Sequence, residues 1–451
     1  MYQIKGTDGV QVLLPPKYIA ELKALPEDTL SGTKAIEEAL QSDYTGFSPG
    51  HNSELLILLL RTKLTQNLAR LVPQLREELE YLVDAEFPLC EDWTRVKWQP
   101  FSLRAVARVS GRAFVGTAVS RQEAWVETSI NFAVHVFMAG IKLSCFPAWL
   151  RPVGQYLVTD LGKIKKDIRV AKGMLQPVLE ERLRRREECN GQADPDAPDD
   201  LIQWFVDSLS EDERADAQVQ AELQLMVAAA SIHTTNGLLC ECMYDLAALP
   251  EIQQELFEEA HDVLVEQGGW QRKEMMAKLR KMDSFMREAQ RLSGNITSFL
   301  RKVMKPISLS DGTRLPAGTS IIAPQAGISR DERFFQHADT FDALRFYRLR
   351  ERDDRRAREV KEEGYAGGGN RWLFTSISDT NVNFGAGRHA CPGRFFAGNE
   401  IKLILAYFLL RYEVRLKEGE ERPKPMAYVM TKSPNMTAEL EFKRRRTPVQ
   451  G

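Results

Sequence analysis

A ten-residue loop at 384–393 constrains this chain more than any other stretch. It reads Phe-Gly-Ala-Gly-Arg-His-Ala-Cys-Pro-Gly, and a run with helical apolar spacing follows from Phe395 to Leu410. A cysteine in such a loop, at the start of a helix, is easily kept as a thiolate, because loop amides can donate to sulfur and the helix dipole favours negative charge. Gly385 and Gly387 allow the loop to turn back towards the sulfur, and Gly393 allows the helix to approach a flat ligand closely.

Taken alone, the cysteine of this loop has two interpretations. Free cysteine is among the most buried residue types and can serve core packing only. Thiolate is also one of the few axial ligands that hold haem iron. Phe384, Gly387, His389, Cys391 and Gly393 have the spacing F-x-x-G-x-[R/H]-x-C-x-G, and in this the chain resembles the cytochrome P450 haem-thiolate enzymes. The resemblance implies haem b (iron protoporphyrin IX), with Cys391 on the iron and the other four residues around the cofactor.

The longest helical pattern runs from Asp216 to Leu249 and stops at Pro250. Its centre, from Ala228, reads Ala-Ala-Ala-Ser-Ile-His-Thr-Thr-Asn-Gly. Small residues there allow a large group to lie against the helix, and hydroxyls in mid-helix can take over backbone carbonyls and loosen a turn. The alternative is a tolerated patch of small residues in a buried helix.

The resemblance identifies this centre with the oxygen-activation turn [A/G]-G-x-[D/E]-T-[T/S]. Thr234 then takes the position of the family's threonine, which implies proton relay through Thr234 and water. The chain departs from the pattern twice, because Ser231 replaces the usual glycine and His233 replaces the acid. A histidine that titrates near neutral pH can substitute for the acid, or it can contact substrate. Ala230 is expected to contact haem, and Ala229 to line the substrate pocket.

Glu288 and Arg291 lie three residues apart on a predicted helix from Lys278 to Leu292. Such a pair alone is usually a surface ion pair of little energetic value. The segment that contains Arg345 resembles the family segment whose arginine completes a buried Glu-Arg-Arg triad. We therefore expect the three side chains to form a structural triad that braces the haem side of the core.

Further cofactor and pocket residues are expected from the resemblance alone. Arg301 precedes a predicted hairpin and is expected, with His389, to neutralise the haem propionates. The family's W-x-x-x-R is absent from the helix predicted for 61–83, so Arg61 and Lys63 are substitute candidates there. The expected substrate pocket also includes three residues further along the chain: Ile296, Phe299 and Ser433.

Several local patterns predict elements away from the cysteine loop. Val10–Leu14 is predicted as a strand, Lys17–Leu25 and Trp93–Phe114 as helices, and Lys302–Ile322 as a hairpin. The charged, glycine-rich stretch at 351–370 is predicted as a loop. The fold class expected is mainly α with small β-sheets, as one cytochrome P450-type domain over residues 1–451.

Composition excludes some classes of function. The net charge is −2, which gives no electrostatic case for a nucleic-acid partner. The six cysteines are scattered without a disulfide-framework spacing, which fits a reducing compartment. Cys240 and Cys242 with His233 are a poor zinc site, because residues two apart point away from each other on a helix.

No uninterrupted apolar run of about 18 residues occurs in the sequence. Eukaryotic members of the resembled family usually carry a membrane anchor and a first helix before the point where this chain begins. The resemblance therefore implies a full-length protein on the cytosolic face of the endoplasmic reticulum membrane, although this chain itself has no transmembrane segment.

The loop and the helix centre look most like filamentous-fungal biosynthetic members of the family. That implies a monooxygenase that inserts one oxygen atom of O2 into a hydrophobic small molecule such as a terpenoid, alkaloid or polyketide. NADPH-cytochrome P450 reductase would supply the electrons. The alternatives are a haem-thiolate enzyme of desaturation, rearrangement or radical coupling, and a non-catalytic haem protein.

Overall fold

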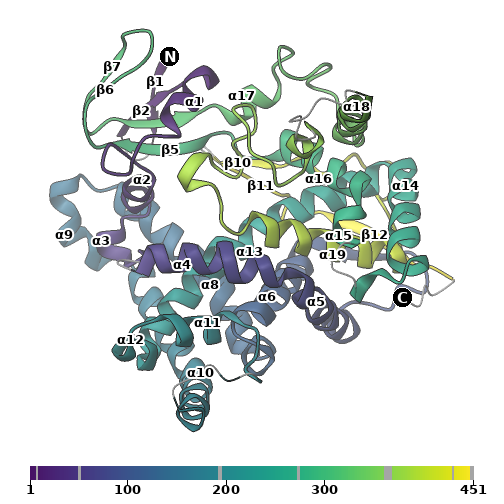
Figure 1. The fold of residues 1–451 in the computed structure, drawn as a ribbon, viewed down its shortest axis with the longest axis horizontal. Helices are drawn as coiled ribbons and strands as arrows, with labels where there is room; N and C mark the ends of the chain where they lie inside the picture. Colours follow the sequence, from purple (N-terminus) through teal and green to yellow (C-terminus); the bar gives the residue numbers. More distant parts are fainter. Residues whose placement is uncertain are drawn as a thin grey trace.

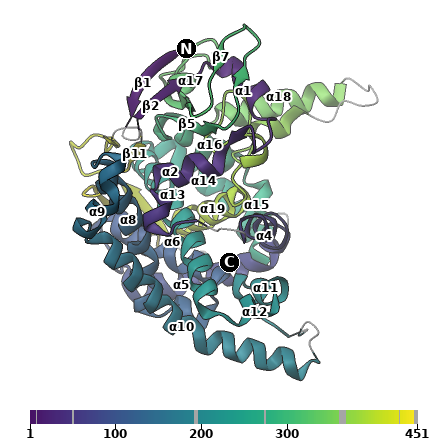
Figure 2. The same cartoon turned by 90° about the vertical axis from the view of Figure 1, so that its left-hand side faces the viewer.

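A computed structural model of the chain describes residues 1–6, 9–48, 52–190, 194, 196–271, 275–359, 368–428 and 431–446. The strands β1, β2 and β5 lie together at one end, most of the long helices lie at the other, and α13 runs between the two parts (Figure 1). The view turned by 90° shows the same division, with α10 farthest from the strands (Figure 2). The mainly helical fold with small sheets predicted from the sequence is confirmed.

The helices lie in chain order as follows: α1 (Ile19–Leu22), α2 (Gly32–Ala39), α3 (Ser42–Thr45), α4 (Ser53–Leu59), α5 (Thr65–Glu86), α6 (Trp98–Phe114), α7 (Thr117–Ser120), α8 (Glu123–Ser144), α9 (Arg151–Gly154), α10 (Asp160–Glu188), α11 (Leu201–Ser208), α12 (Glu211–Ala215), α13 (Ala217–Ala248), α14 (Pro250–His261), α15 (Met275–Lys278), α16 (Arg280–Ser293), α17 (Gln325–Ser329), α18 (Arg345–Glu359) and α19 (Arg394–Arg411).

Among the described residues the strands form small sheets. The largest has the order β1-β2-β8-β5-β3, in which β2 and β8 are parallel and the other pairs antiparallel; the others are β4-β12-β9, β6-β7 and β10-β11. Their bounds are β1 (Tyr2–Gly6), β2 (Gly9–Leu13), β3 (Leu30–Ser31), β4 (Thr94–Lys97), β5 (Ser298–Val303), β6 (Ile307–Ser308), β7 (Arg314–Leu315), β8 (Ser320–Ala323), β9 (Tyr412–Arg415), β10 (Met426–Tyr428), β11 (Thr431–Ser433) and β12 (Glu439–Arg444).

Helix α13 is the central element of the helical part, where it packs against α6, α8, α10 and α16. Its start is fixed by Asp216, whose side chain accepts a hydrogen bond of 2.7 Å from the amide of Gln218. Its end is fixed by Pro250, which cannot continue the helix and instead starts α14. Most side chains of α13 are buried in the main apolar core. A helix buried on nearly every side is a rigid support for any group that lies against it.

Three local predictions need correction. The stretch predicted as a helix from Trp93 begins with strand β4, because Val96 pairs with Leu440 of β12. The predicted helix at Lys17–Leu25 is a 3₁₀ turn followed only by the short α1. The predicted loop at 351–370 is helical up to Glu359, in α18.

Candidate active site

The loop that holds Cys391 closes on itself. The amide of Cys391 donates to the carbonyl of Phe384 over 2.7 Å, and the amide of Gly385 donates to that of Val382 over 2.9 Å. Gly385 and Gly387 have φ of +72° and +63°, in the left-handed region that favours glycine. The two glycines therefore provide the backbone reversal that the sequence predicted.

Of these two glycines, Gly387 leaves less space for a side chain. A Cβ added at Gly387 would lie 2.1 Å from the carbonyl oxygen of Lys23. We expect Gly387→Ala to lower the free energy of unfolding by the backbone strain of an alanine at positive φ and, because of the clash with Lys23, by about 2 kcal/mol or more in addition. Denaturant unfolding measures the difference. Gly419→Ala is the matched control, because Gly419 has φ of +81° with nothing within 4 Å of its Cβ position. Equal losses in the two variants would contradict the expectation.

The thiol of Cys391 is half-buried in this loop. Burial raises its pKa, whereas the amides of Gly393 and Arg394 and the positive charge of Arg394 act in the opposite direction. Arg394 is held close, because its Nη1 donates to the carbonyl of Cys391 over 2.9 Å. A sulfur that receives backbone amides beside a cation suits a thiolate bound to a metal. The donor set at Cys391 thus fits the haem iron that the sequence predicted.

Helix α13 has one open face, formed by Ala230 and Thr234. Both side chains are exposed, and they lie one turn apart in a helix that is otherwise mostly buried. The neighbouring Ala229, Ser231 and His233 are half-buried. In the part of the chain that the structure describes, no side chain covers these small residues, so a large flat group can lie there. This observation also fits a haem.

The two polar side chains predicted to be catalytic are both held by backbone carbonyls. The hydroxyl of Thr234 donates to the carbonyl of Ala230 over 2.8 Å, which is the mid-helix exchange expected of it. His233 Nε2 lies 2.9 Å from the carbonyl oxygen of Ile130 on α8. A carbonyl only accepts, so this bond places a proton on Nε2. The roles of Thr234 and His233 in catalysis remain predictions.

Arg301 is a buried cation that lacks an ordinary partner. It is 7% exposed, donates to the carbonyls of Leu300 (2.7 Å) and Ala386 (3.3 Å), and lies over the ring of Phe299 at 4.5 Å. Among the described residues no carboxylate lies within 4 Å of it. Burial lowers its pKa to about 10, while Glu27 acts in the opposite direction. A buried guanidinium without a paired anion is costly, so this position suits the carboxylate of a ligand.

His389 lies beside Arg301. A Cβ at Gly32 would be 3.0 Å from the His389 ring and 3.3 Å from Nη1 of Arg301, so the two side chains flank that glycine. His389 Nε2 is 2.6 Å from Oε2 of Glu27. Burial lowers the pKa of His389, and Arg301 lowers it further, while Glu27 raises it. The structure thus brings the two predicted propionate-binding residues together.

Two further residues lie near Arg301, His389 or the cysteine loop: Glu27, which the sequence analysis did not identify, and Arg61, which it gave as one of two candidates. Glu27 was missed; it also accepts from the hydroxyl of Ser31 and the amide of Thr33 at the start of α2, and nothing in the sequence relates it to His389. Arg61 lies in a π-helical turn, Leu60–Leu64, and donates to the carbonyl of Arg388 over 2.6 Å. Arg61 therefore reaches the cysteine loop, although both Arg61 and Lys63 are exposed.

The predicted triad lies together in the core. Glu288 is 0% exposed and receives two hydrogen bonds from Arg291, of 2.9 and 2.7 Å, and one from Arg345, of 3.1 Å. The amide of Asp342 donates to the same carboxylate over 3.0 Å. The remaining guanidinium donors bind backbone carbonyls, including those of Ala338 and Thr340. These bonds connect α16 to the start of α18 and to the segment before it.

The predicted pocket residues lie in different surroundings. Ala229 is half-buried beside the open face, and Ile296 and Ser433 are half-buried elsewhere. Phe299 is 3% exposed, packs in the second apolar core and lies under Arg301, so its position gives no support to a pocket role. The tip of the hairpin that contains Ser433 lies outside the described residues.

The other two predicted cofactor contacts are compatible with a flat ligand. Phe384 is half-buried and meets Phe374 edge-on, with ring centroids 5.2 Å apart. Gly393 has open space where a Cβ would lie, and its φ of −85° is ordinary, so its value as a glycine would lie in clearance and not in backbone conformation.

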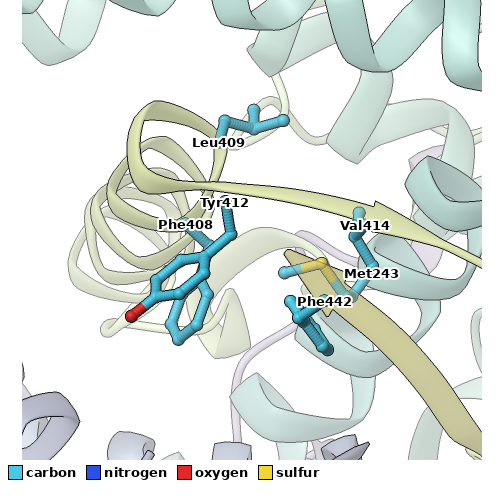
Figure 3. A pocket seen from close by; sticks show the side chains of 6 residues that line it. All are labelled: Met243, Phe408, Leu409, Tyr412, Val414 and Phe442. Atoms are coloured by element: carbon cyan, nitrogen blue, oxygen red, sulfur yellow. The ribbon is translucent and has the colours of Figure 1, made fainter. Parts of the chain in front are cut away.

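A void in the apolar core is not a competing site. It is lined by Met243, Phe408, Leu409, Tyr412, Val414 and Phe442, as Figure 3 shows. It has no room for a water molecule. Among the described residues no group of three His, Cys, Asp or Glu side chains could hold a metal ion. The cysteine loop and the open face of α13 are therefore the candidate site.

No single helix among the described residues is long and apolar enough to cross a membrane. Two consecutive helical segments, Glu123–Ser144 and Ala148–Leu157, have together the length and apolar composition of a membrane span, but the chain bends by 115° between them.

The chain is similar to known proteins over nearly its whole length. Residues 50–440 match the sequence pattern of the family "Cytochrome P450". The chain is 35% identical to cytochrome P450 monooxygenase AN1598 of Emericella nidulans, over 99% of this chain and 80% of that protein. It is 34% identical to cytochrome P450 monooxygenase braC of Annulohypoxylon truncatum (99% and 86%) and 32% identical to cytochrome P450 monooxygenase paxP of Penicillium paxilli (99% and 83%). The solved structure of retinoic acid bound cyanobacterial CYP120A1 has a similar fold, with a TM-score of 0.70 at 14% identity, over 97% of this chain and 89% of that one.

Proposed function

The chain belongs to the cytochrome P450 family, and on that premise we propose that it inserts one oxygen atom of O2 into a hydrophobic fungal natural product. Its relatives are named monooxygenases, so the chain is an oxidoreductase of the monooxygenase type. The observation that carries the proposal is the half-buried Cys391 thiol, set in the family's loop with backbone amides on its sulfur. The substrate class, whether terpenoid, alkaloid or polyketide, rests on the fungal relatives.

The cofactor proposed is haem b. Cys391 would hold the iron, Arg301 and His389 the propionates, and Phe384, Gly387, Gly393 and Ala230 the surrounding contacts. When bound, haem-thiolate iron would supply O2 activation, with the Cys391 thiolate donating electron density to the iron. Electrons would come from NADPH through NADPH-cytochrome P450 reductase. The protein contributes orientation, electrostatics and control of water.

This chain's own residues would control charge and protons. Arg301 is already positioned and desolvated, so a carboxylate that pairs with it would not have to displace an existing ion pair. The Thr234 hydroxyl lies on the open face and could pass a proton between water and a group bound over that face by exchanging its bond to Ala230.

The test of the function is turnover with a reductase. Purified protein supplied with haem, the reductase and a library of fungal terpenoids, alkaloids and polyketides should give products heavier by one oxygen atom, only when both NADPH and O2 are present. Products that lose two hydrogens, or isomers formed without NADPH, would indicate the alternative chemistry of desaturation or rearrangement. A non-catalytic haem protein would give a haem spectrum and no product.

Replacement of Thr234 tests its role in proton transfer. We expect Thr234→Ala to form at least about tenfold less product per NADPH consumed, because a positioned acid–base group typically contributes that much or more. Thr234→Ser keeps the hydroxyl and should retain most of the yield. Product and NADPH are measured in the same reaction. If the alanine variant formed as much product per NADPH as the parent protein, Thr234 would have no role in proton transfer.

The proposed location is the cytosolic face of the endoplasmic reticulum membrane. An apolar patch supports it: Trp149, Val153, Tyr156 and Leu157 are 65–84% exposed on consecutive short helical turns after α8. Large exposed apolar side chains that include Trp and Tyr are typical of membrane-surface contact.

Vesicle binding tests this patch. We expect Trp149→Ser with Tyr156→Ser to weaken binding to phosphatidylcholine vesicles at least about tenfold, because burying two aromatic rings contributes more than about 1.5 kcal/mol. Leu89→Ser is the matched control, since Leu89 is 69% exposed and lies elsewhere, between α5 and β4. Unchanged binding by the double variant would argue against the patch.

A further inference from the structure

The open face of α13 ends beyond Thr234, where another part of the chain covers the helix. Thr234 is exposed, whereas Glu241 is 3% exposed and Asp245 is 4% exposed. Glu241 follows Thr234 by about two helical turns and Ala230 by about three, so these three residues lie on one side of α13. The covered stretch therefore continues the open face towards the C-terminal end of the helix.

The segment that covers this stretch begins with Arg422. Its Nη2 donates to Oε2 of Glu241 over 2.7 Å, and its Nε donates to Oδ1 of Asp245. Because the two acidic residues lie one turn apart on α13, a single guanidinium group can bond both. Its Nη1 donates to the carbonyl of Pro423 over 2.7 Å, which fixes the guanidinium relative to the segment that follows.

The bonds of Arg422 balance charge in a buried place. The side chains of Glu241 and Asp245 are each 5% exposed, and that of Arg422 is 29% exposed. Burial raises the pKa of both carboxyl groups, and the charge of Arg422 acts against it. Removing one partner of such an ion pair leaves an uncompensated buried charge, which is strongly unfavourable. Arg422 is therefore a firm attachment of the segment to α13.

Two further bonds attach the segment downstream. The hydroxyl of Tyr244, which is 0% exposed on α13, donates to the carbonyl of Asn435 over 2.7 Å. Lys432 Nζ donates to the carbonyl of Leu292 on α16 over 3.1 Å. The strands β10 and β11 lie between Arg422 and Asn435, and among the described residues they pair only with each other. The strand pair is thus attached to the helices on both sides.

We propose that Arg422 is a positioning residue that holds the strand pair β10-β11 against α13 and so sets how large a substrate the open face accepts. The inference rests on the proposed function, because it concerns the space in which that substrate binds. Ser433, predicted from the sequence as a pocket residue, belongs to β11. The strand pair is then a wall of the pocket. When Arg422 releases the two carboxylates, this wall recedes and the space admits bulkier ligands.

Hydrogen exchange tests the attachment without any ligand of the open face. An isolated pair of short strands is marginally stable in water, so the amides of β10 and β11 are protected while the wall stays attached. We expect Arg422→Gln to speed exchange in peptides covering 422–437 at least about tenfold, measured by mass spectrometry. Peptides from the first half of α13 should exchange at the parent rate, because that half stays packed against α8 and α10.

The chain offers a matched control and a milder variant. Arg415 lies on β9 and bonds Glu441 of β12 over 2.9 Å, with its side chain 50% exposed. Arg415→Gln should leave exchange at 422–437 at the parent rate. Tyr244→Phe keeps the ring and removes only the bond to Asn435, so it should speed exchange at 422–437 without unpairing a buried charge. This second variant tests the attachment even if Arg422→Gln does not fold.

Azole ligands of two sizes measure the space that the wall limits. The protein with haem bound is titrated with imidazole and with 4-phenylimidazole, and the absorption change gives the Kd of each. We expect Arg422→Gln to bind 4-phenylimidazole at least about fivefold more tightly, relative to imidazole, than the parent protein does, because pocket walls discriminate ligands by size. Tyr244→Phe should change this ratio in the same direction, and Arg415→Gln should keep it. A change in global stability alone would not alter the ratio.

Three results would overturn the proposal. They are parent-rate exchange at 422–437 in both Arg422→Gln and Tyr244→Phe, an unchanged ratio of azole affinities in these variants, and equally fast exchange in Arg415→Gln. A protein that binds no haem would give no azole spectrum and would refute the proposed function. The exchange measurement reports the attachment separately, so the two failures can be told apart.

Discussion

Cys391→Ala is expected to abolish the thiolate-ligated haem spectrum and all turnover. The substitution removes the sulfur that receives the amides of Gly393 and Arg394, so no other group at this position can ligate iron. The measurement is the reduced, carbon-monoxide-bound spectrum of purified protein supplied with haem, together with product formation. Cys391→Ser keeps the shape of the side chain and should lose the same spectrum, which separates ligation from packing.

The control for this prediction is another cysteine. Cys145 is exposed at the end of α8, where its sulfur donates to the carbonyl of Ile141. Cys145→Ala should leave spectrum and turnover unchanged. If Cys391→Ala kept both, Cys391 would be a packing residue, and the haem assignment would be wrong.

Glu288→Gln is expected to lower the free energy of unfolding by about 3–5 kcal/mol, because it leaves two buried guanidinium groups without their shared anion. Arg291 and Arg345 are 5% and 9% exposed and cannot turn to solvent without opening the core. Their carbonyl bonds would remain, but carbonyls carry no charge to balance them. Denaturant unfolding followed by circular dichroism measures the loss.

An exposed ion pair provides the comparison for the triad. Glu188 pairs with Arg184 over 2.7 Å, with both side chains 60% exposed. Glu188→Gln should change the free energy of unfolding by less than about 1 kcal/mol. A similar small loss in Glu288→Gln would mean that the triad does not brace the core.

The helices were predicted best where apolar spacing and end signals agree. Asp216 and Pro250 limit α13 in the sequence and do so in the structure. The strand β4 was missed because its four residues become a strand only by pairing with β12, at the other end of the chain. Local patterns carry no information about such partners.

Within the candidate site, the sequence by itself determined the residues of the cysteine loop and their turn, because two glycines and a cysteine at fixed spacing allow few local conformations. Only the tertiary structure decided which distant groups meet that site. Glu27 reaches His389, and Arg422 reaches Glu241 and Asp245, across elements that the sequence leaves unconnected. The physical reason is that burial and charge pairing depend on how whole helices pack, and no local spacing encodes that packing.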